Sequence, residues 1–205
     1  MIEENIKAII FDFGGVLIDL NYHATIDAFQ QLGIHNFDTL YTQAQQSNLF
    51  DDIETGKISS QRFINGLLDY LPHTVTPNEV VTAWNAMLLD IDPEKAHLLT
   101  ELRKKYPVYL LSNTNEIHIN LAYRRWEKTM GHPIQNYFNK IYLSHEVGMR
   151  KPHKEIFEHV CADSGLNPQH TLFIDDSIQH IEGAQKVGLK TIHHPSNGAL
   201  GNYFS

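Results

Sequence analysis

Hydrophobic and polar positions follow two different rhythms along this chain. Residues 7–13 form a short apolar run with polar flanks, which is too short for a buried helix and typical of a central strand. From about residue 22 to residue 90, apolar residues recur at spacings of three and four, which predicts helices. Helix start signals lie at residues 59–60 and 76–79. The expected helices are His23–Leu32, Phe37–Leu49, Ser60–Tyr70 and Pro77–Leu89.

The rhythm changes after the Asp92-Pro93 pair, where helices and strands alternate. Such alternation predicts an α/β fold, with a parallel sheet covered by helices on both faces. Residues 193–205 are expected to form a loop or a loosely docked end. The expected helices of this region are Glu94–Lys105, Asn115–Thr129, Lys154–Ser164 and Ile178–Val187. The expected strands are Val108–Leu111, Lys140–Leu143, Thr171–Ile174 and Thr191–His193.

Polar side chains gather where the predicted strands end. In a parallel sheet, ligands bind outside the carboxyl ends of the strands. The expected strands at residues 7–13, 108–111 and 171–174 end in, or lead directly to, polar residues. The strand at 140–143 leads through a loop to a lysine just before a helix. We therefore expect these side chains to converge on one pocket. They are Asp12, Ser112, Asn113, Lys151, Asp175 and Asp176.

These residue types suit phosphate chemistry. Asp12 and Asp175 could share a divalent cation, and Mg²⁺ prefers oxygen ligands. The cation would neutralise a phosphate and leave a nearby carboxylate free to attack phosphorus. Ser112 and Asn113 could hydrogen-bond phosphate oxygens, and Lys151 could neutralise both the phosphate and the carboxylates. Without such positive charge, the clustered carboxylates would raise one another's pKa values.

Composition narrows the classes of function. The chain has 205 residues, of which 42% are hydrophobic, enough for one main core and a modest insert. The formal net charge of −8 and the lack of a Lys/Arg run argue against a nucleic-acid partner. No apolar stretch is long enough for a membrane span, and the N-terminus does not resemble a secretory signal. A soluble, cytoplasmic protein is therefore expected.

Neither the single cysteine nor the histidines indicate a disulfide framework or a zinc site. Cys161 is the single cysteine, which excludes an internal disulfide framework, and a packed thiol on a helix is expected. The 13 histidines are scattered without paired ligand spacing such as H-E-x-x-H, which argues against a zinc site.

Four short motifs occur in order along the chain: IIFDFGGV, LLSN, RKPHKEIF and FIDDS. Together they resemble the motifs of the haloacid dehalogenase (HAD) superfamily of hydrolases, most of which are phosphatases, and they cover nearly the whole chain. The resemblance implies a three-layer Rossmann-like core formed by residues 1–18 and 91–205. It also implies an inserted all-helical cap at residues 19–90, which lies over the active site and shapes substrate choice.

The resemblance also implies a role for each matching residue. Asp12 would be the nucleophile that forms an aspartyl-phosphate. Ser112 would hold the transferring phosphoryl group, and Lys151 would stabilise the nucleophile and the phosphate. Magnesium is the implied cofactor. Its expected surroundings are Asp12, the main-chain carbonyl of Gly14, Asp175 and, in the metal's immediate environment, Asp176.

Gly14 departs from the pattern of the family. Most phosphatases of the family carry an aspartate at this position, which serves as general acid and then as general base. A positioned general acid contributes ~10²–10⁴-fold to the rate. Its loss should matter least for leaving groups that need little protonation, such as an anomeric oxygen or an acyl group. A branch of the family with the same Asp-x-Gly pattern includes phosphatases that act on glucose 1-phosphate.

Asp19 and His180 each have two interpretations. Asp19 could supply the missing proton from the cap junction, or it could cap the next helix or face solvent. His180 stands where relatives often have Asn or Asp. It could lie next to metal-bound waters, or it could be an ordinary histidine on a helix surface.

The helical region carries the candidates for substrate choice. Tyr22, His23, Tyr41 and Asn48 could each face a substrate, and the sequence does not rank them. Apolar residues at helical spacing are expected to form the core of the cap. They are Phe29, Leu32, Phe63, Leu67, Trp84 and Leu88.

The sequence thus predicts a magnesium-dependent phosphatase for a small phosphorylated metabolite such as a sugar phosphate, present as a monomer or weak homodimer. The cap would open and close to admit substrate and exclude water. A 2-haloacid dehalogenase is one alternative, which the Asp175-Asp176 pair disfavours. A catalytically silent binding or regulatory module is the other; Gly14 favours it, whereas the intact Asp12, Lys151 and Asp175 disfavour it.

Overall fold

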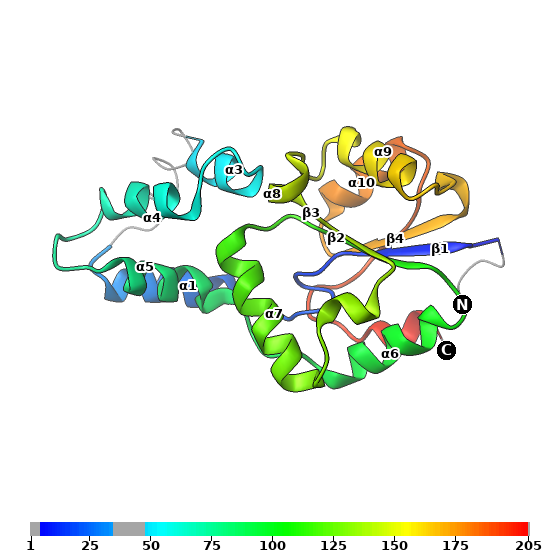
Figure 1. Ribbon diagram of the computed structural model, residues 1–205, viewed down its shortest axis with the longest axis horizontal. Coiled ribbons are helices and arrows are strands. Elements are labelled where there is room, and N and C mark those ends of the chain that lie inside the picture. The colour runs from blue at the N-terminus through cyan, green and yellow to red at the C-terminus, as the bar shows by residue number, and fades with distance from the viewer. Residues whose placement is uncertain (1–4, 35–47, 205) are drawn as a thin grey trace.

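A five-stranded parallel sheet forms the centre of the larger part of the molecule (Figure 1). The computed structural model describes residues 5–34 and 48–204. The strand order β3-β2-β1-β4-β5 places β1 in the middle, so the chain switches direction across the sheet at the carboxyl end of β1. The strands are β1 Ala8–Phe11, β2 Val108–Ser112, β3 Lys140–Leu143, β4 Thr171–Asp175 and β5 Lys190–His193.

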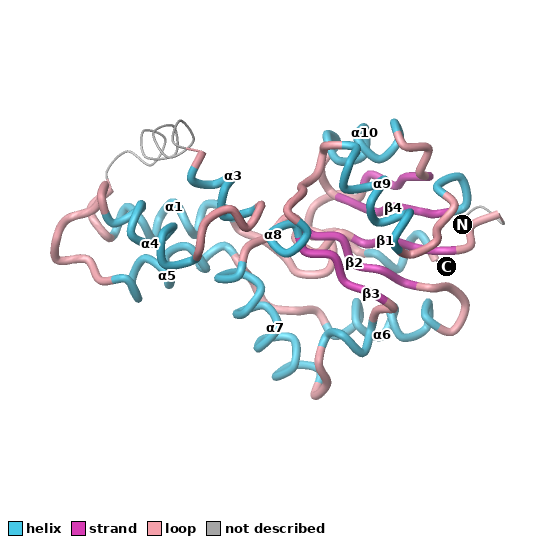
Figure 2. Tube along the Cα trace, turned by 45° about the horizontal axis from the view of Figure 1, so that its top comes forward, coloured by secondary structure: helices cyan, strands magenta, loops and turns pink. Residues whose placement is uncertain are grey.

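Helices cover both faces of this sheet, as Figures 1 and 2 show. Ile9 and Phe11 of β1 pack into the cluster that includes α6 and α7, whereas Ala8 and Ile10 pack with α9 and α10. Alternate strand residues therefore serve two apolar layers, as expected for a sheet buried on both faces. The helices are α6 Pro93–Arg103, α7 Glu116–Met130, α9 Lys154–Asp163 and α10 Ile178–Lys186. Shorter helical segments are α8 Ser144–Val147, η2 Ile134–Tyr137, η3 Pro168–His170 and η4 Leu200–Tyr203.

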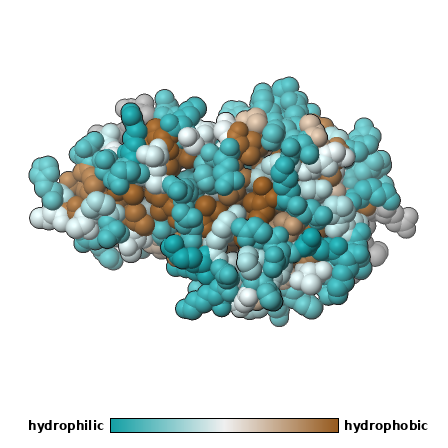
Figure 3. Space-filling model, viewed as in Figure 1, coloured by the Kyte–Doolittle hydropathy of each residue, from teal (hydrophilic) through white to brown (hydrophobic). Residues whose placement is uncertain are grey.

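A second, all-helical part lies beyond the carboxyl ends of the strands (Figure 1). Its apolar core contains Phe29, Phe63, Leu67 and Trp84, and Ile117 from α7 completes it. Apolar residues reach the surface over this part and near its junction with the sheet, between polar ones (Figure 3). The helices are α1 Tyr22–Gln31, α3 Leu49–Glu54, α4 Ser60–Leu68, α5 Pro77–Trp84 and the 3₁₀ turn η1 Asn85–Met87.

Two adjacent segments connect the helical part to the sheet part. Leu20 and Leu88 form an antiparallel bridge. Backbone hydrogen bonds from Asn21 N to Met87 O, at 2.8 Å, and from Leu89 N to Asp19 O, at 3.0 Å, extend it. The outgoing and returning chains are thus held side by side.

Most expected elements are confirmed within one to three residues, and the strand at 140–143 matches. Ser59 caps α4, and Thr76 with Glu79 forms a capping box at α5. The helix expected over 77–89 is too long, because α5 ends at Trp84 and a 3₁₀ turn follows. Leu88 packs in the core of the sheet part rather than in the helical part. Most of the helix expected at 37–49 lies outside the described residues, and so does Tyr41. The short helices α3 and α8 were not expected.

The described tail is a loop between β5 and η4, as expected, but the expectation that it is loosely docked is wrong. His194 and Leu200 are buried, and the Phe204 ring lies 6.2 Å from that of Phe11. Asn197 makes two hydrogen bonds to the backbone of Leu20, at 2.9 and 3.0 Å. Isolated anchors such as these have no periodicity for a sequence pattern to reveal. Cys161 is buried on α9 as expected, and burial raises the pKa of its thiol to about 11. Among the described residues, no helix has the length and apolarity needed to cross a membrane.

Candidate active site

Asp12 stands at the end of the central strand, directly before a tight turn. Its N–H donates to Ile174 O at 2.9 Å, which continues the pairing of β1 with β4. Gly15 has φ +73°, and a Cβ atom there would lie 2.1 Å from Oδ2 of Asp176. Gly15 therefore allows both the turn and the close approach of Asp176, the residue after β4. The Asp12 carboxylate accepts the Phe13 N–H at Oδ1, 2.6 Å away.

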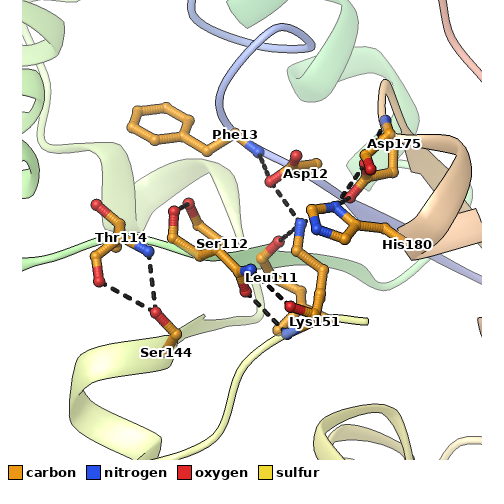
Figure 4. Close-up of polar contacts among 11 residues, drawn as sticks. Asp12, Phe13, Leu111, Ser112, Thr114, Ser144, Lys151, Asp175 and His180 are labelled. Atoms are coloured by element: carbon orange, nitrogen blue, oxygen red, sulfur yellow. Dashed lines mark hydrogen bonds and ion pairs between the residues drawn. The ribbon is translucent and has the colours of Figure 1, made fainter. Parts of the chain in front are cut away.

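Lys151 joins the two buried carboxylates (Figure 4). Its Nζ lies 2.8 Å from Asp12 Oδ1 and 2.7 Å from Asp175 Oδ2, and it donates to Leu111 O at 3.1 Å. The ammonium group is fully buried and lies 5.5 Å from the centre of the Phe173 ring. One cation thus serves two carboxylates, so the cluster keeps an excess of negative charge.

The protonation of this cluster follows from burial and pairing. Burial raises the pKa of Asp12 well above its usual range; the Asp175 charge adds to this rise, and Lys151 opposes it. Burial also acts on Asp175, but Lys151 and His180 outweigh it and lower the pKa of that carboxyl. For Lys151 burial is overcome by the two carboxylates, which hold its pKa above the usual value. An additional cation would relieve the remaining charge excess.

His180 is not an ordinary surface histidine. Its Nδ1 lies 2.9 and 3.0 Å from the two oxygens of Asp175, and the Ser177 N–H donates to Oδ1 of the same carboxylate at 2.8 Å. Burial lowers the pKa of His180. Oxygen atoms of Asp12 and Asp175 and a ring nitrogen of His180 all lie within 4.8 Å of one another. The two carboxylates fit a hard divalent cation, with His180 holding one of them in place.

The end of β2 brings the phosphate-binding candidates to the same edge. Ser112 is buried at the end of β2, and among the described residues its Oγ makes one polar contact, 3.4 Å from the backbone oxygen of Asn113. The side-chain amide of Asn113 makes hydrogen bonds to both N and O of Lys151, each at 2.9 Å. Asn113 thus holds the loop that carries Lys151. Ser144, at the end of β3, ties in Thr114 through N and O at 2.9 and 3.0 Å.

Asp19 does not cap helix α1, and its side chain is 34% exposed. Its Oδ1 lies 2.6 Å from Nζ of Lys95, a lysine with almost no exposed surface. The N-cap of α1 is Asn21. Asp19 is therefore an ion-pair partner at the cap junction. Asp176 lies close under Gly15, and its backbone oxygen contacts His193 Nε2 at 3.0 Å.

A cavity of about 500 Å³ opens beside the nucleophile, between the sheet part and the helical part. Phe13, Gly14 and Ser112 line its end near Asp12. Tyr22 and Asn48, two of the four substrate-facing candidates, also line it. The wall also includes Phe50, Asp51, Glu54, Trp84, His118 and Arg150.

Arg150 links the loop before Lys151 to helix α3. Its guanidinium pairs with Asp51 and, through Nη2 at 3.0 Å, with Oε2 of Glu54. Sequence reasoning gave no role to Arg150, Glu54, His118 or Ser144. Ser144 directly follows a predicted strand, so its position at the carboxyl edge could have identified it. The others depend on contacts between distant segments.

Comparisons with known proteins identify the family. The model of the family described as haloacid dehalogenase-like hydrolase matches residues 6–188. A D-ribitol-5-phosphate phosphatase of Bacteroides thetaiotaomicron is 37% identical over 194 residues, covering 95% of this chain and 94% of the relative.

Solved structures of HAD family enzymes are also similar to this chain. A HAD family enzyme of Bacteroides thetaiotaomicron in a magnesium complex has a TM-score of 0.92 and 35% identity, covering 98% of this chain and 99% of that chain. A complex with magnesium and inorganic phosphate has a TM-score of 0.90 and 36% identity, covering 98% and 100%. From its sequence match and its fold, this chain belongs to the haloacid dehalogenase-like hydrolases.

Proposed function

We propose that this protein is a magnesium-dependent phosphatase for a small phosphorylated polyol or sugar, acting through an aspartyl-phosphate on Asp12. The observation that carries the proposal is the buried contact of one lysine with two carboxylates, Lys151 Nζ to Asp12 Oδ1 and Asp175 Oδ2. A relative that is 37% identical acts on D-ribitol 5-phosphate, and similar structures hold magnesium and phosphate.

The nucleophile is held for attack by its own hydrogen bonds. Oδ1 of Asp12 accepts from the Phe13 N–H and Lys151, which leaves Oδ2 as the oxygen able to attack phosphorus. Lys151 offsets charge on the carboxylate and on an incoming phosphate as a point charge. Ser112 Oγ makes one weak contact within residues 5–34 and 48–204, so it is available to donate to a phosphoryl oxygen. Catalysis would then rest on positioning and charge neutralisation.

The metal site we propose comprises Asp12, Asp175 and the main-chain carbonyl of Gly14, with Asp176 near it. The donors are oxygen atoms and the cluster carries excess negative charge, which fits Mg²⁺. Bound there, Mg²⁺ would neutralise phosphate charge and orient the phosphoryl group. His180 holds Asp175 in place through Nδ1. Ser177 supports the same carboxylate from its backbone.

Phosphate release from sugar, polyol and acyl phosphates, measured with magnesium and with a chelator, tests this proposal. The expected result is magnesium-dependent release that falls by roughly 10³-fold or more in Asp12→Asn, because the variant lacks the attacking carboxylate. Glu158→Gln, a change in an exposed ion pair of α9, serves as a control with full activity.

Two other results would replace the proposal. Chloride release from 2-chloropropionate without metal would identify a dehalogenase, in which the aspartate attacks carbon. Magnesium binding without turnover of any substrate would identify a silent binding module, the reading that Gly14 favours.

A further inference from the structure

The cavity continues well past the phosphate end toward the helical part. Trp84, Phe50 and Met87 give it apolar walls, and its volume of about 500 Å³ is in the range of small-molecule pockets, roughly 300–1,000 Å³. An apolar wall favours the carbon chain of a ligand but cannot recognise its polar groups. The polar side chains of this wall therefore decide which phosphorylated molecules fit.

Three of those polar groups are already paired with one another. Arg150 is paired with Asp51 and Glu54, which occupies the guanidinium and offers carboxylate oxygens to the cavity. Glu54 is mostly buried, and burial raises the pKa of its carboxyl despite Arg150. The Thr25 hydroxyl, also on the wall, donates to Trp84 O and accepts from Met87 N.

His118 is the wall residue whose orientation is fixed most completely. Its ring stacks on Trp84, with centres 4.9 Å apart and planes at 15°. Its Nδ1 lies 2.9 Å from Oδ1 of Asn85. Trp84 and Asn85 come from the end of α5 and the turn after it, whereas His118 begins α7, so two elements hold the ring.

These contacts decide what the ring can bind. Because the Asn85 amide oxygen is an acceptor, the proton of the ring lies on Nδ1. Burial lowers the pKa of His118 to about 3, so the ring is neutral at physiological pH. Nε2 therefore carries a lone pair, and it has no hydrogen-bond partner in residues 5–34 and 48–204. It is the ring nitrogen available to a molecule in the cavity.

We propose that Nε2 of His118 accepts a hydrogen bond from a substrate hydroxyl, so that the cavity selects phosphorylated alcohols over phosphorylated acids of the same length. The inference rests on the proposed function and names its substrate class. A hydroxyl donates to Nε2, whereas a carboxylate brings only acceptors and a negative charge near Asp51 and Glu54. An alkyl chain would leave the buried nitrogen unsatisfied.

Three five-carbon substrates with a primary alkyl leaving group test this selection: ribitol 5-phosphate, 5-phosphooxypentanoate (an acid without hydroxyl groups) and pentyl phosphate. The wild-type kcat/KM for the polyol should exceed that for either other substrate by about tenfold or more, the value of one good hydrogen bond. Equal hydrolysis of all three by the wild type would overturn the proposal without any variant.

Two variants assign the selection to His118. His118→Phe keeps a ring on Trp84 but lacks the acceptor, so KM for ribitol 5-phosphate should rise about tenfold and the preference should vanish. His118→Gln places an amide oxygen near the position of Nε2 and should keep most of the preference. Acetyl phosphate, which offers no hydroxyl, should be hydrolysed by all three proteins within about twofold, well below the tenfold step of one hydrogen bond.

The contrary outcomes are distinct. A loss shared equally by acetyl phosphate would make His118 a structural residue, and an unchanged preference in His118→Phe would place the hydroxyl elsewhere; either result refutes the proposal. No release from any of these phosphates by the wild type would refute the proposed function instead. Calorimetric binding of ribitol 5-phosphate and 5-phosphooxypentanoate to wild type and His118→Phe would then decide the role of His118 alone.

Discussion

Lys151 is a single buried cation between two carboxylates, and its removal should be costly. Lys151→Met would leave Asp12 and Asp175 buried without that partner, and breaking a buried pair costs about 3–5 kcal/mol. Urea unfolding without metal should show this loss of unfolding free energy. Added Mg²⁺ should restore part of it, because ligand that binds only the folded state stabilises it.

A double-variant cycle separates charge from packing at the same site. Asp12→Asn removes one of the two charges that Lys151 compensates. Combined with Lys151→Met, it should cost less than the sum of the two single changes, by about 1–3 kcal/mol, as for residues in direct contact. Additive costs would show that the ion pair does not stabilise the fold.

Gly14 and Leu20 together occupy the place of the usual acid. A Cβ on Gly14 would lie 2.7 Å from Leu20 Cδ1, so an aspartate there requires the leucine to move. Without a general acid, the wild-type kcat/KM for aryl phosphates should fall steeply as the leaving-group pKa rises. The double variant Gly14→Asp with Leu20→Ala should show a shallower dependence, measured over the same series.

Leu20→Ala alone is the control, since it opens the space without adding an acid. Its slope should match that of the wild type. A flat dependence in the wild type would mean that another side chain already donates the proton, and it would contradict the prediction.

One loop connects the chemistry to the cap. Arg150 pairs with Asp51 and Glu54 on α3, and the next residue, Lys151, contacts the nucleophile. Arg150→Met should therefore free α3 from the loop, raise KM several-fold and speed amide exchange in α3. An ion pair between half-buried charges contributes about 1 kcal/mol or slightly more, which corresponds to a several-fold change in KM.

Lys104→Met is the matched control for Arg150→Met. Lys104 and Glu101 form an exposed pair at the C-terminal end of α6, outside residues 19–90. Removing an exposed pair should change stability little and leave exchange in α3 unchanged. If Arg150→Met behaves like this control, the ion pairs of Arg150 with Asp51 and Glu54 do not hold the cap in place.

At the level of elements, the sequence predicts what depends on local pattern. Asp12 and Asp175 could be placed together because parallel strands end at one edge, and Thr76 could be placed as a cap because its partners are three residues away. Arg150 pairs with a residue 99 positions away, and no local pattern encodes that contact. Helix α5 stops at Trp84 although the apolar spacing continues.

On the scale of the whole molecule, we propose a core of residues 1–18 and 91–205 with a cap at 19–90. The paired segments around Leu20 and Leu88 support this division, because the chain leaves and returns there side by side. The core of the cap is nevertheless completed by Ile117 of α7. The cap should thus depend on the core for its stability, while the core depends less on the cap.

The chain has two tryptophans, one in each part, which makes this asymmetry measurable. Trp84 lies in the core of the cap and Trp126 in that of the sheet part. Leu67→Ala and Leu99→Ala each remove a fully buried side chain, in the cap and core respectively, at about 2–5 kcal/mol. Fluorescence during urea unfolding would be followed in Trp84→Phe and Trp126→Phe backgrounds.

Leu67→Ala should lower the unfolding midpoint reported by Trp84 and leave that reported by Trp126 nearly unchanged. Leu99→Ala should lower both midpoints, since a cap that lacks the surface around Ile117 loses part of its own core. Such a one-way dependence allows the cap to open for substrate without loosening the sheet that holds Asp12. Equal shifts of both probes in Leu67→Ala would instead show one cooperative unit, and the division at residues 19 and 90 would have no thermodynamic meaning.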